Sequence, residues 1–347
     1  MTDRSLSVAI EVLTSIWQRV LQRSPIGIND DFFELGGTSS LAARLFAEIA
    51  EQTGQHLTPV TVCAAPTIVA LAARLELPPS RSPLVLLKPG ADGPPVFMTH
   101  GIGSSVIDLV PLARCLPLTQ PIYGVEARGN DGVEEPFDRI EDMAQAHLDA
   151  IRMIQPGGSY FLVGYSLGGL VSLEVARRLS ANGHNVALLA MLDSYPHRCH
   201  LSIGQHARLA LQLAKQRMSG GMRASGSSHQ SALARQGANL LGHSPVEQSI
   251  ARTMQRVKEA QHRALRNYRP RFYNGRVKFV RAAIVSHFPS DPVPVWSHLV
   301  GTLEVETVPG DHVGMLTAAV ETLARMVGWY VREAVDLLPH SPGGLDS

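Results

Sequence analysis

Residues 161–179 read FLVGYSLGGLVSLEVARRL, and this stretch decides the fold. It begins as an apolar strand and continues as a helix whose apolar residues recur at spacings of three and four. Gly164, Ser166 and Gly168 form a Gly-x-Ser-x-Gly pattern at the junction. Larger side chains at the two glycine positions would collide with the strand and the helix of so tight a turn. A serine held there is a candidate nucleophile, since the helix N-terminus favours a developing oxyanion.

Strands and helices alternate on both sides of this turn. Apolar runs predict strands at 96–99, 122–125, 160–163, 186–192, 277–280 and 303–308. Helical patterns fit between most of them, at 105–115, 139–155, 167–182 and 313–332. Such alternation predicts a mostly parallel sheet covered by helices on both faces. Together with the serine turn, it predicts an α/β hydrolase fold.

The segment 197–266 breaks this alternation, because it contains no credible strand. Two helical patterns, at 207–218 and 244–268, flank a Gly/Ser-rich stretch at 219–230. An insertion of this length in an α/β domain is usually functional, so we expect a helical lid. A structural helical cap without motion is the alternative.

A serine nucleophile of this fold needs a histidine base, which comes last in the chain order. The sequence PGDHVGML places His312 after the last predicted strand and before the last predicted helix. This position favours His312 over His287 and His298. We therefore predict His312 as the base.

The acid has two candidates. Asp193 ends the apolar run VALLAMLD, at the carboxyl edge of the sheet where catalytic groups of open α/β sheets gather. Asp291, in FPSDPVP, follows the next predicted strand and is the alternative. Asp311 is adjacent to His312 and is interpreted as a turn residue. Topology favours Asp193.

An oxyanion hole requires two backbone N–H groups. One is expected from Leu167, directly after the nucleophile. The other is expected from the loop HGIGS at 100–104, which follows an early strand, with Ile102 as the donor. The alternative interpretation of this loop is a plain glycine turn.

The N-terminal residues show a different pattern. Amphipathic helices are predicted at 5–22, 40–54 and 65–76, which make a small all-α bundle. Residues 77–95 contain six prolines and cannot continue a helix. The expected organisation is a helical domain at 1–78, a linker at 79–95, an α/β domain at 96–336 and a flexible tail at 337–347.

The sequence DDFFELGGTSSLAARL, residues 30–45, opens the second of these helices. Ser39 stands at the helix N-terminus, where the helix dipole and free N–H groups would favour an attached phosphodiester. The alternative is that Thr38, Ser39 or Ser40 simply caps the helix.

Residues 84–332 resemble the type I thioesterases that end nonribosomal peptide and polyketide synthases. The matching segments are HGIGS, GYSLGG, LLAMLDSYP, YRPRFYNGRVKFVRA and PGDHVGML. The resemblance implies a serine hydrolase that works through an acyl-enzyme. It also implies an acid at Asp193 and a lid at 197–266.

Residues 8–76 resemble the peptidyl or aryl carrier core, in which FFxLGGxS precedes a long apolar helix. The resemblance implies covalent phosphopantetheine on Ser39, although Ser40 stands where the family usually has Leu or Ile. It implies as partners a phosphopantetheinyl transferase and upstream synthetase modules for adenylation and condensation.

Together the two resemblances imply that an acyl or peptidyl thioester on Ser39 is transferred to Ser166. Release then follows by hydrolysis or cyclisation. The alternatives are a stand-alone esterase acting on diffusible esters, and a carrier with a non-catalytic docking hydrolase domain.

The overall composition argues against several classes of protein. The net charge of +1, from 31 basic and 30 acidic residues, argues against a nucleic-acid binder. The chain has no run of 18 apolar residues, which argues against a membrane span. Three cysteines without a CxxC pattern predict neither a disulfide framework nor a metal site. Sparse cysteines of this kind are typical of reduced thiols in a cytoplasmic protein.

Overall fold

The structure, a computed structural model, describes residues 3–75, 77, 82–218, 245–284 and 288–338. The Gly/Ser-rich stretch at 219–230, His287 and residues 339–347 of the predicted tail lie outside the described residues.

In the described part of the chain, seven strands form one sheet in the order β1-β3-β2-β4-β5-β6-β7. Their bounds, from β1 to β7, are Leu84–Lys88, Val96–Thr99, Ile122–Val125, Ser159–Tyr165, Asn185–Leu192, Tyr273–Ala282 and Val300–Val308. All neighbouring pairs are parallel except β1 with β3. The six predicted strands and the mostly parallel α/β hydrolase sheet are confirmed.

Strand β1 corrects the expected linker at 79–95, because it lies inside that segment. Its apolar LVLL run stands between Pro83 and Pro89, which cannot donate to a sheet ladder. Since β1 is at the edge and pairs only with β3, the flanking prolines are tolerated. Part of the proline-rich segment is therefore sheet.

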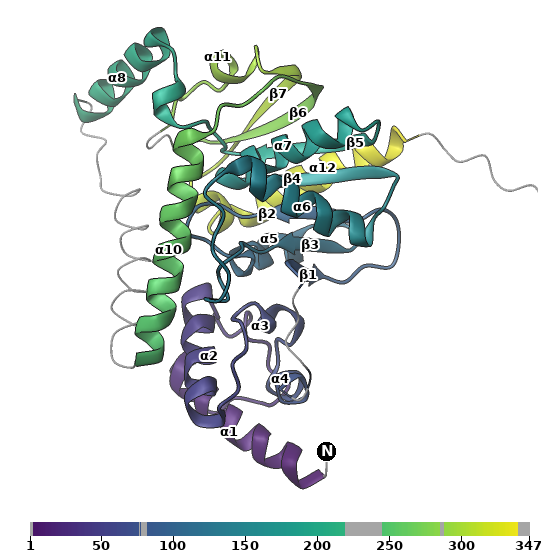
Figure 1. Cartoon of the computed structure of the whole chain (residues 1–347), viewed down its shortest axis with the longest axis vertical. Helices are drawn as coiled ribbons and strands as arrows, with labels where there is room; N and C mark the ends of the chain where they lie inside the picture. Colours follow the sequence, from purple (N-terminus) through teal and green to yellow (C-terminus); the bar gives the residue numbers. More distant parts are fainter. Residues whose placement is uncertain (1–2, 76, 78–81, 219–244, 285–287, 339–347) are drawn as a thin grey trace, which may run out of the picture.

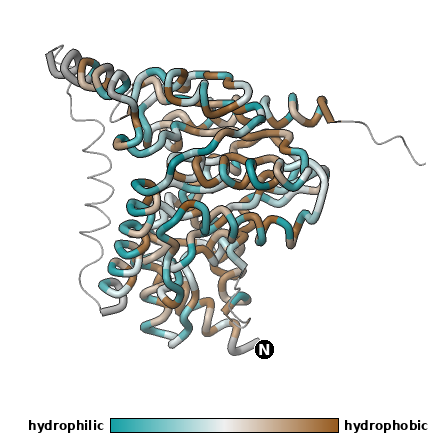
Figure 2. Tube along the Cα trace, turned by 45° about the horizontal axis from the view of Figure 1, so that its top comes forward, coloured by the Kyte–Doolittle hydropathy of each residue, from teal (hydrophilic) through white to brown (hydrophobic). Residues whose placement is uncertain are grey.

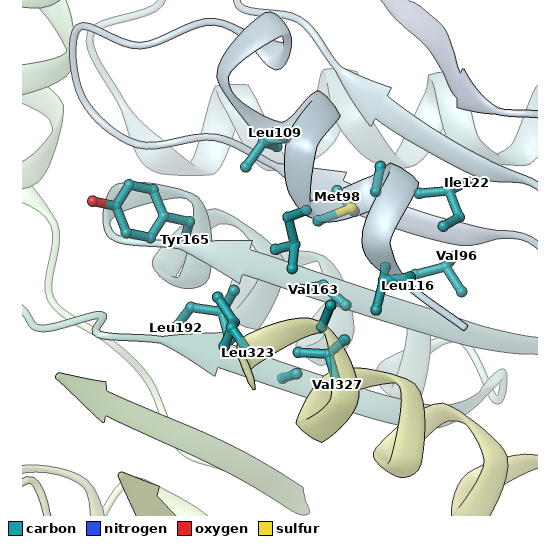
Figure 3. Packing of buried hydrophobic residues seen from close by; sticks show 14 of the residues in the cluster. Val96, Met98, Leu109, Leu116, Ile122, Val163, Tyr165, Leu192, Leu323 and Val327 are labelled. Carbon is teal, nitrogen blue, oxygen red and sulfur yellow. The ribbon is translucent and has the colours of Figure 1, made fainter. Parts of the chain in front are cut away.

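Helices cover both faces of the sheet (Figure 1). Helices α6 (Ile140–Ile154) and α7 (Leu167–Ala181) pack on one face, and α5 (Val110–Cys115) and α12 (Val320–Asp336) pack on the other. Alternate residues of a strand point to opposite faces. Tyr165 of β4 therefore points toward the α5 and α12 side, as Figure 3 shows. The shorter helices are η1 Val106–Leu109, η2 Arg198–His200, α11 Val293–Trp296 and η3 Gly314–Leu316.

The N-terminal domain is the expected small helical bundle. Its helices are α1 Asp3–Leu21, α2 Ser39–Thr53, α3 Thr61–Ala64 and α4 Ile68–Arg74. It has its own core, in which Trp17 and Phe32 are fully buried and meet edge to face with ring centroids 5.4 Å apart. Helix α3 is an addition to the predicted elements, because four residues are too few to show a helical period.

Helices α8 (Ile203–Met218) and α10 (Pro245–Asn267) occupy the segment 197–266. Figure 1 shows α10 running alongside both domains, and it packs against α2 of the N-terminal bundle. Apolar and hydrophilic residues alternate along its turns (Figure 2), with Val257 and Ala260 buried. No helix of the described residues has the length and apolar character needed to cross a membrane.

Candidate active site

Ser166 lies on the turn between β4 and α7, with φ 56° and ψ −120°. A positive φ is uncommon for a residue that carries a side chain. Two backbone hydrogen bonds hold it, from Ser166 N to Leu192 O at 2.9 Å and from Gly169 N to Ser166 O at 3.1 Å. A Cβ on Gly164 would lie 2.3 Å from the carbonyl oxygen of Gly168. The turn therefore excludes a side chain at this glycine position.

Asp193 and His312 meet at the carboxyl edge of the sheet, the first directly after β5 and the second after β7. His312 Nδ1 lies 2.7 Å from Asp193 Oδ2, and Nδ1 is the donor because a carboxylate only accepts. Asp193 is 5% exposed, and its Oδ1 accepts a hydrogen bond from Ala282 N at 3.3 Å. The arrangement leaves Nε2 of His312 available as a base.

The other acidic candidates have different partners. The Asp291 carboxylate accepts a hydrogen bond from Val293 N at 3.0 Å at the start of α11. The Asp311 carboxylate accepts from Gly314 N at 2.7 Å, as expected for a turn residue. Neither carboxylate is paired with His312 in the described contacts, whereas Asp193 is.

Tyr165, which precedes the serine, holds His312 in place. The two rings are stacked with centroids 4.8 Å apart and an interplanar angle of 23°, and Tyr165 Oη donates to His312 O at 2.8 Å. Burial raises the pKa of Tyr165, so the hydroxyl remains a donor. Within the described residues Ser166 Oγ has no hydrogen bond to His312. In free hydrolases this bond is often long and tightens when substrate binds.

Replacing Tyr165 with leucine is expected to lower kcat for thioester cleavage with little change in KM, because His312 loses both its stack and its anchor. Phenylalanine at this position keeps the ring contact and loses one hydrogen bond. It should therefore recover most of the rate, to within about tenfold of the native enzyme. Steady-state kinetics on a small-molecule thioester measure both. A leucine variant with native kcat would contradict the role of Tyr165.

The predicted oxyanion loop passes directly over the nucleophile. A Cβ on Gly101 would lie 3.0 Å from Ser166 Cβ, a contact so tight that a larger residue would require its neighbours to shift. No acceptor is found for the N–H groups of Ile102 and Leu167 among the described contacts. The next N–H, of Gly103, donates to Gln261 Oε1 of α10 at 2.8 Å. Gln261 is 4% exposed and ties the loop to the 197–266 segment, a role that no sequence motif indicated.

Glu126 fixes the other end of this loop. Its Oε2 accepts hydrogen bonds from Ser105 Oγ at 2.6 Å and from Val106 N at 3.2 Å, and its Oε1 accepts from Ala127 N at 2.9 Å. Burial alone would raise the pKa of Glu126, but the interaction with His100 and the bonds from Ser105 and Ala127 lower it overall. Glu126 is thus a buried carboxylate that orders the loop beside Ser166.

At the start of α2 the structure separates the residue that caps the helix from the candidate attachment residue. Thr38 is the N-cap, since its side chain accepts from Leu41 N at 3.3 Å. Ser39 is the first helical residue, and its hydroxyl has no hydrogen-bond partner among the described residues. A free hydroxyl at the N-terminus of a 15-residue helix fits an attached phosphodiester. No group of three His, Cys, Asp or Glu side chains in the described chain could hold a metal ion.

Curated relatives of the chain are large peptide synthetases. The Dimodular nonribosomal peptide synthase of Bacillus subtilis (strain 168) is 40% identical over 190 residues, which cover 54% of this chain and 8% of the relative. Enterobactin synthase component F of Escherichia coli (strain K12) is 33% identical over 172 residues, 48% of this chain and 13% of the relative. The chain thus spans a small part of the length of these relatives.

Solved structures share the fold. A four-domain nonribosomal peptide synthetase bound to AMP and glycine matches 95% of this chain and 26% of its own, with 23% identity and a TM-score of 0.59. A thioesterase domain bound with a dodecadepsipeptide matches 70% of this chain and 97% of its own, with 22% identity and a TM-score of 0.52.

Family models match both domains. The phosphopantetheine attachment site model matches residues 11–75, which hold the free Ser39 hydroxyl. The thioesterase domain model matches residues 94–329, which hold Ser166, Asp193 and His312. The chain therefore belongs to the thioesterase domain family, with a phosphopantetheine attachment domain preceding the thioesterase domain.

Proposed function

We propose that this chain takes an acyl or peptidyl group from phosphopantetheine on Ser39, holds it as an ester on Ser166, and releases it. The observation that carries the proposal is the 2.7 Å contact of His312 Nδ1 with the buried Asp193 carboxylate, at the sheet edge where Ser166 stands on its strained turn. This is the arrangement that a serine acyl transferase requires.

The residues divide the work as follows. Nε2 of His312 accepts the proton of Ser166 Oγ as the oxygen attacks the thioester carbonyl. Asp193 orients the imidazole and stabilises its charged form. The N–H groups of Leu167 and Ile102 hold the oxyanion. The imidazolium then returns the proton to the departing thiolate sulfur, which leaves an ester on Ser166.

Phosphopantetheine, when bound to Ser39, supplies the thiol that carries the acyl group and an arm that reaches the thioesterase domain. Covalent tethering gives an effective concentration in the millimolar range for a flexible link, so the docking contact can be modest. The proposed partners are a phosphopantetheinyl transferase and upstream adenylation and condensation modules. We place the reaction in the cytoplasm, in keeping with the three free cysteines.

Release from Ser166 requires a second nucleophile, water or a group within the acyl chain. Loading the carrier with a defined acyl group and following its loss by intact-protein mass spectrometry tests the proposal. A product that contains one added water shows hydrolysis, and a product without it shows cyclisation. Retention of the acyl group on the carrier, with rapid cleavage of diffusible esters, would favour the stand-alone esterase instead.

Replacing Asp193 with asparagine is expected to slow thioester cleavage by roughly 10³- to 10⁴-fold, because the amide stabilises the wrong imidazole tautomer and no imidazolium. Asp291→Asn is the matched control, since the hydrogen bond described for the Asp291 carboxylate goes to the start of α11. The measurement is the rate at which each variant cleaves the same thioester. Equal losses in the two variants would argue against Asp193 as the acid.

A further inference from the structure

Arg114 of the thioesterase domain binds the carrier domain. Arg114, in the last turn of α5, donates from Nη1 to Asp31 Oδ1 and from Nη2 to Asp31 Oδ2, both at 2.9 Å. Its guanidinium also lies over the Phe33 ring, 4.7 Å from the centroid. We call these three residues, Asp31, Phe33 and Arg114, the carrier clasp. Two parallel charge-assisted bonds fix the relative orientation of the domains as well as their contact.

Apolar contacts surround the clasp. Ile107 of η1 is 2% exposed and packs into the hydrophobic core of the carrier domain, although it belongs to the thioesterase domain. In the other direction, Val60 and Cys63 of the carrier pack against the core of the thioesterase domain. Burial raises the pKa of Cys63, and the nearby carboxylates of Glu126 and Asp108 raise it further. The Cys63 thiol therefore reports on the docked interface.

The docking surface adjoins the active site. Ile107 lies two residues after the segment 100–105, which passes over Ser166 and is held by Glu126. On the carrier side, Asp31 and Phe33 precede Ser39 by eight and six positions, and α2, which begins at Ser39, packs against α10. The clasp thus joins the loop that leads to Ser39 to the domain that removes the acyl group.

The ion pair of the clasp is weak enough for the carrier domain to leave the thioesterase domain. The side chains of Arg114 and Asp31 are 33% and 17% exposed to solvent, so water and salt weaken the ion pair. A carrier loaded by upstream enzymes has to present the same Ser39 to them, and a permanently buried contact would prevent this.

We propose that the surface around Arg114 and Ile107 is the thioesterase domain's docking site for the acidic and aromatic carrier loop, and that the clasp sets the fraction of time the carrier spends in the position for discharge. The proposal rests on the proposed function, and it names the partner of that site as the carrier's Asp31–Phe33 edge. Breaking the clasp slows transfer from the carrier and leaves the chemistry at Ser166 unchanged.

The test compares Arg114→Ala with the native chain in two assays. One follows loss of an octanoyl group from the phosphopantetheine of the carrier, and the other follows cleavage of octanoyl-N-acetylcysteamine, which needs no docking. We expect about tenfold slower loss from the carrier, since the two charged hydrogen bonds, weakened by solvent, are together worth about that factor, and an unchanged rate on the small thioester. Equal rates from the carrier in both proteins would overturn the clasp.

A second readout does not depend on catalysis. With the exposed Cys115 and Cys199 replaced by serine, and before phosphopantetheine is attached to Ser39, alkylation by iodoacetamide reports on Cys63 alone. Arg114→Ala should speed it about tenfold, because the carrier leaves the surface that protects the thiol. Unchanged alkylation would overturn the proposal. Failure of the native chain to cleave either thioester would instead count against the proposed function, and the Cys63 result would still stand.

Two further variants separate docking from folding. Asp31→Asn keeps the oxygen that accepts from Phe33 N at 2.8 Å, so the local turn is preserved while the charge is lost. Combined with Arg114→Ala it should add almost nothing to either single effect, because both remove the same bond. Arg128→Ala is the matched control, since Arg128 also pairs with a carboxylate (Glu134, 3.4 Å) and covers an aromatic ring, but within the thioesterase domain. Additive losses, or an equal effect of Arg128→Ala, would overturn the clasp.

Discussion

Replacing Ser166 with alanine is expected to slow acyl release by roughly 10⁴- to 10⁶-fold, because the ester intermediate cannot form and only binding and the oxyanion donors remain. The measurement is the lifetime of an octanoyl group on the carrier, followed by intact-protein mass spectrometry. The variant should have the melting temperature of the native chain, since the Ser166 hydroxyl has no hydrogen bond among the described residues that would be lost.

Labelling by a fluorophosphonate gives the control for Ser166. The reagent should modify the native chain at this one residue and leave Ser166→Ala unmodified, while Ser297→Ala, at an exposed serine of the α11 end, keeps the native behaviour. Absence of labelling in the native protein would support a docking domain without catalysis. Release by Ser166→Ala within tenfold of the native rate would exclude the acyl-enzyme mechanism.

Replacing Ser39 with alanine is expected to abolish attachment of phosphopantetheine completely, because no other hydroxyl takes its place at the free first position of α2. Thr38 is already engaged as the helix cap. The measurement is the mass increase of the chain after incubation with coenzyme A and a phosphopantetheinyl transferase. Ser39→Ala should also abolish discharge of an acyl group from the carrier, whereas cleavage of small-molecule thioesters by Ser166 continues.

Ser40→Ala is the matched control for the attachment site, since it removes a hydroxyl one position further along the same helix. It should gain the full mass of the arm and discharge its acyl group at the native rate. A mass increase retained in Ser39→Ala and lost in Ser40→Ala would move the attachment site to Ser40, and would make the register of the carrier motif one residue later.

Local patterns predicted most of the framework. The strand-turn-helix at 161–179 and the six parallel strands are visible in the sequence because a buried strand and an amphipathic helix each show their own period over a few residues. Strand β1 was hidden by its flanking prolines, and α3 was too short to show a period. Gly164 was predictable because its steric constraint, the carbonyl of Gly168, lies only four residues away. At Gly168 the atoms nearest to an added Cβ are the carbonyl oxygens of Thr99 and His100, which are distant in the chain.

The tertiary structure decided what depends on contacts between distant residues. The sequence placed Ser39, Ser166 and His312 by motif and favoured Asp193 over Asp291 as the acid. Only the packing of β5, β6 and β7 brings the Asp193 carboxylate to His312. Tyr165, Gln261 and the carrier clasp had no sequence signal, because each acts on a partner more than 80 residues away. Spacing along a chain reveals short-range geometry, whereas such pairs exist only once the sheet and the two domains have assembled.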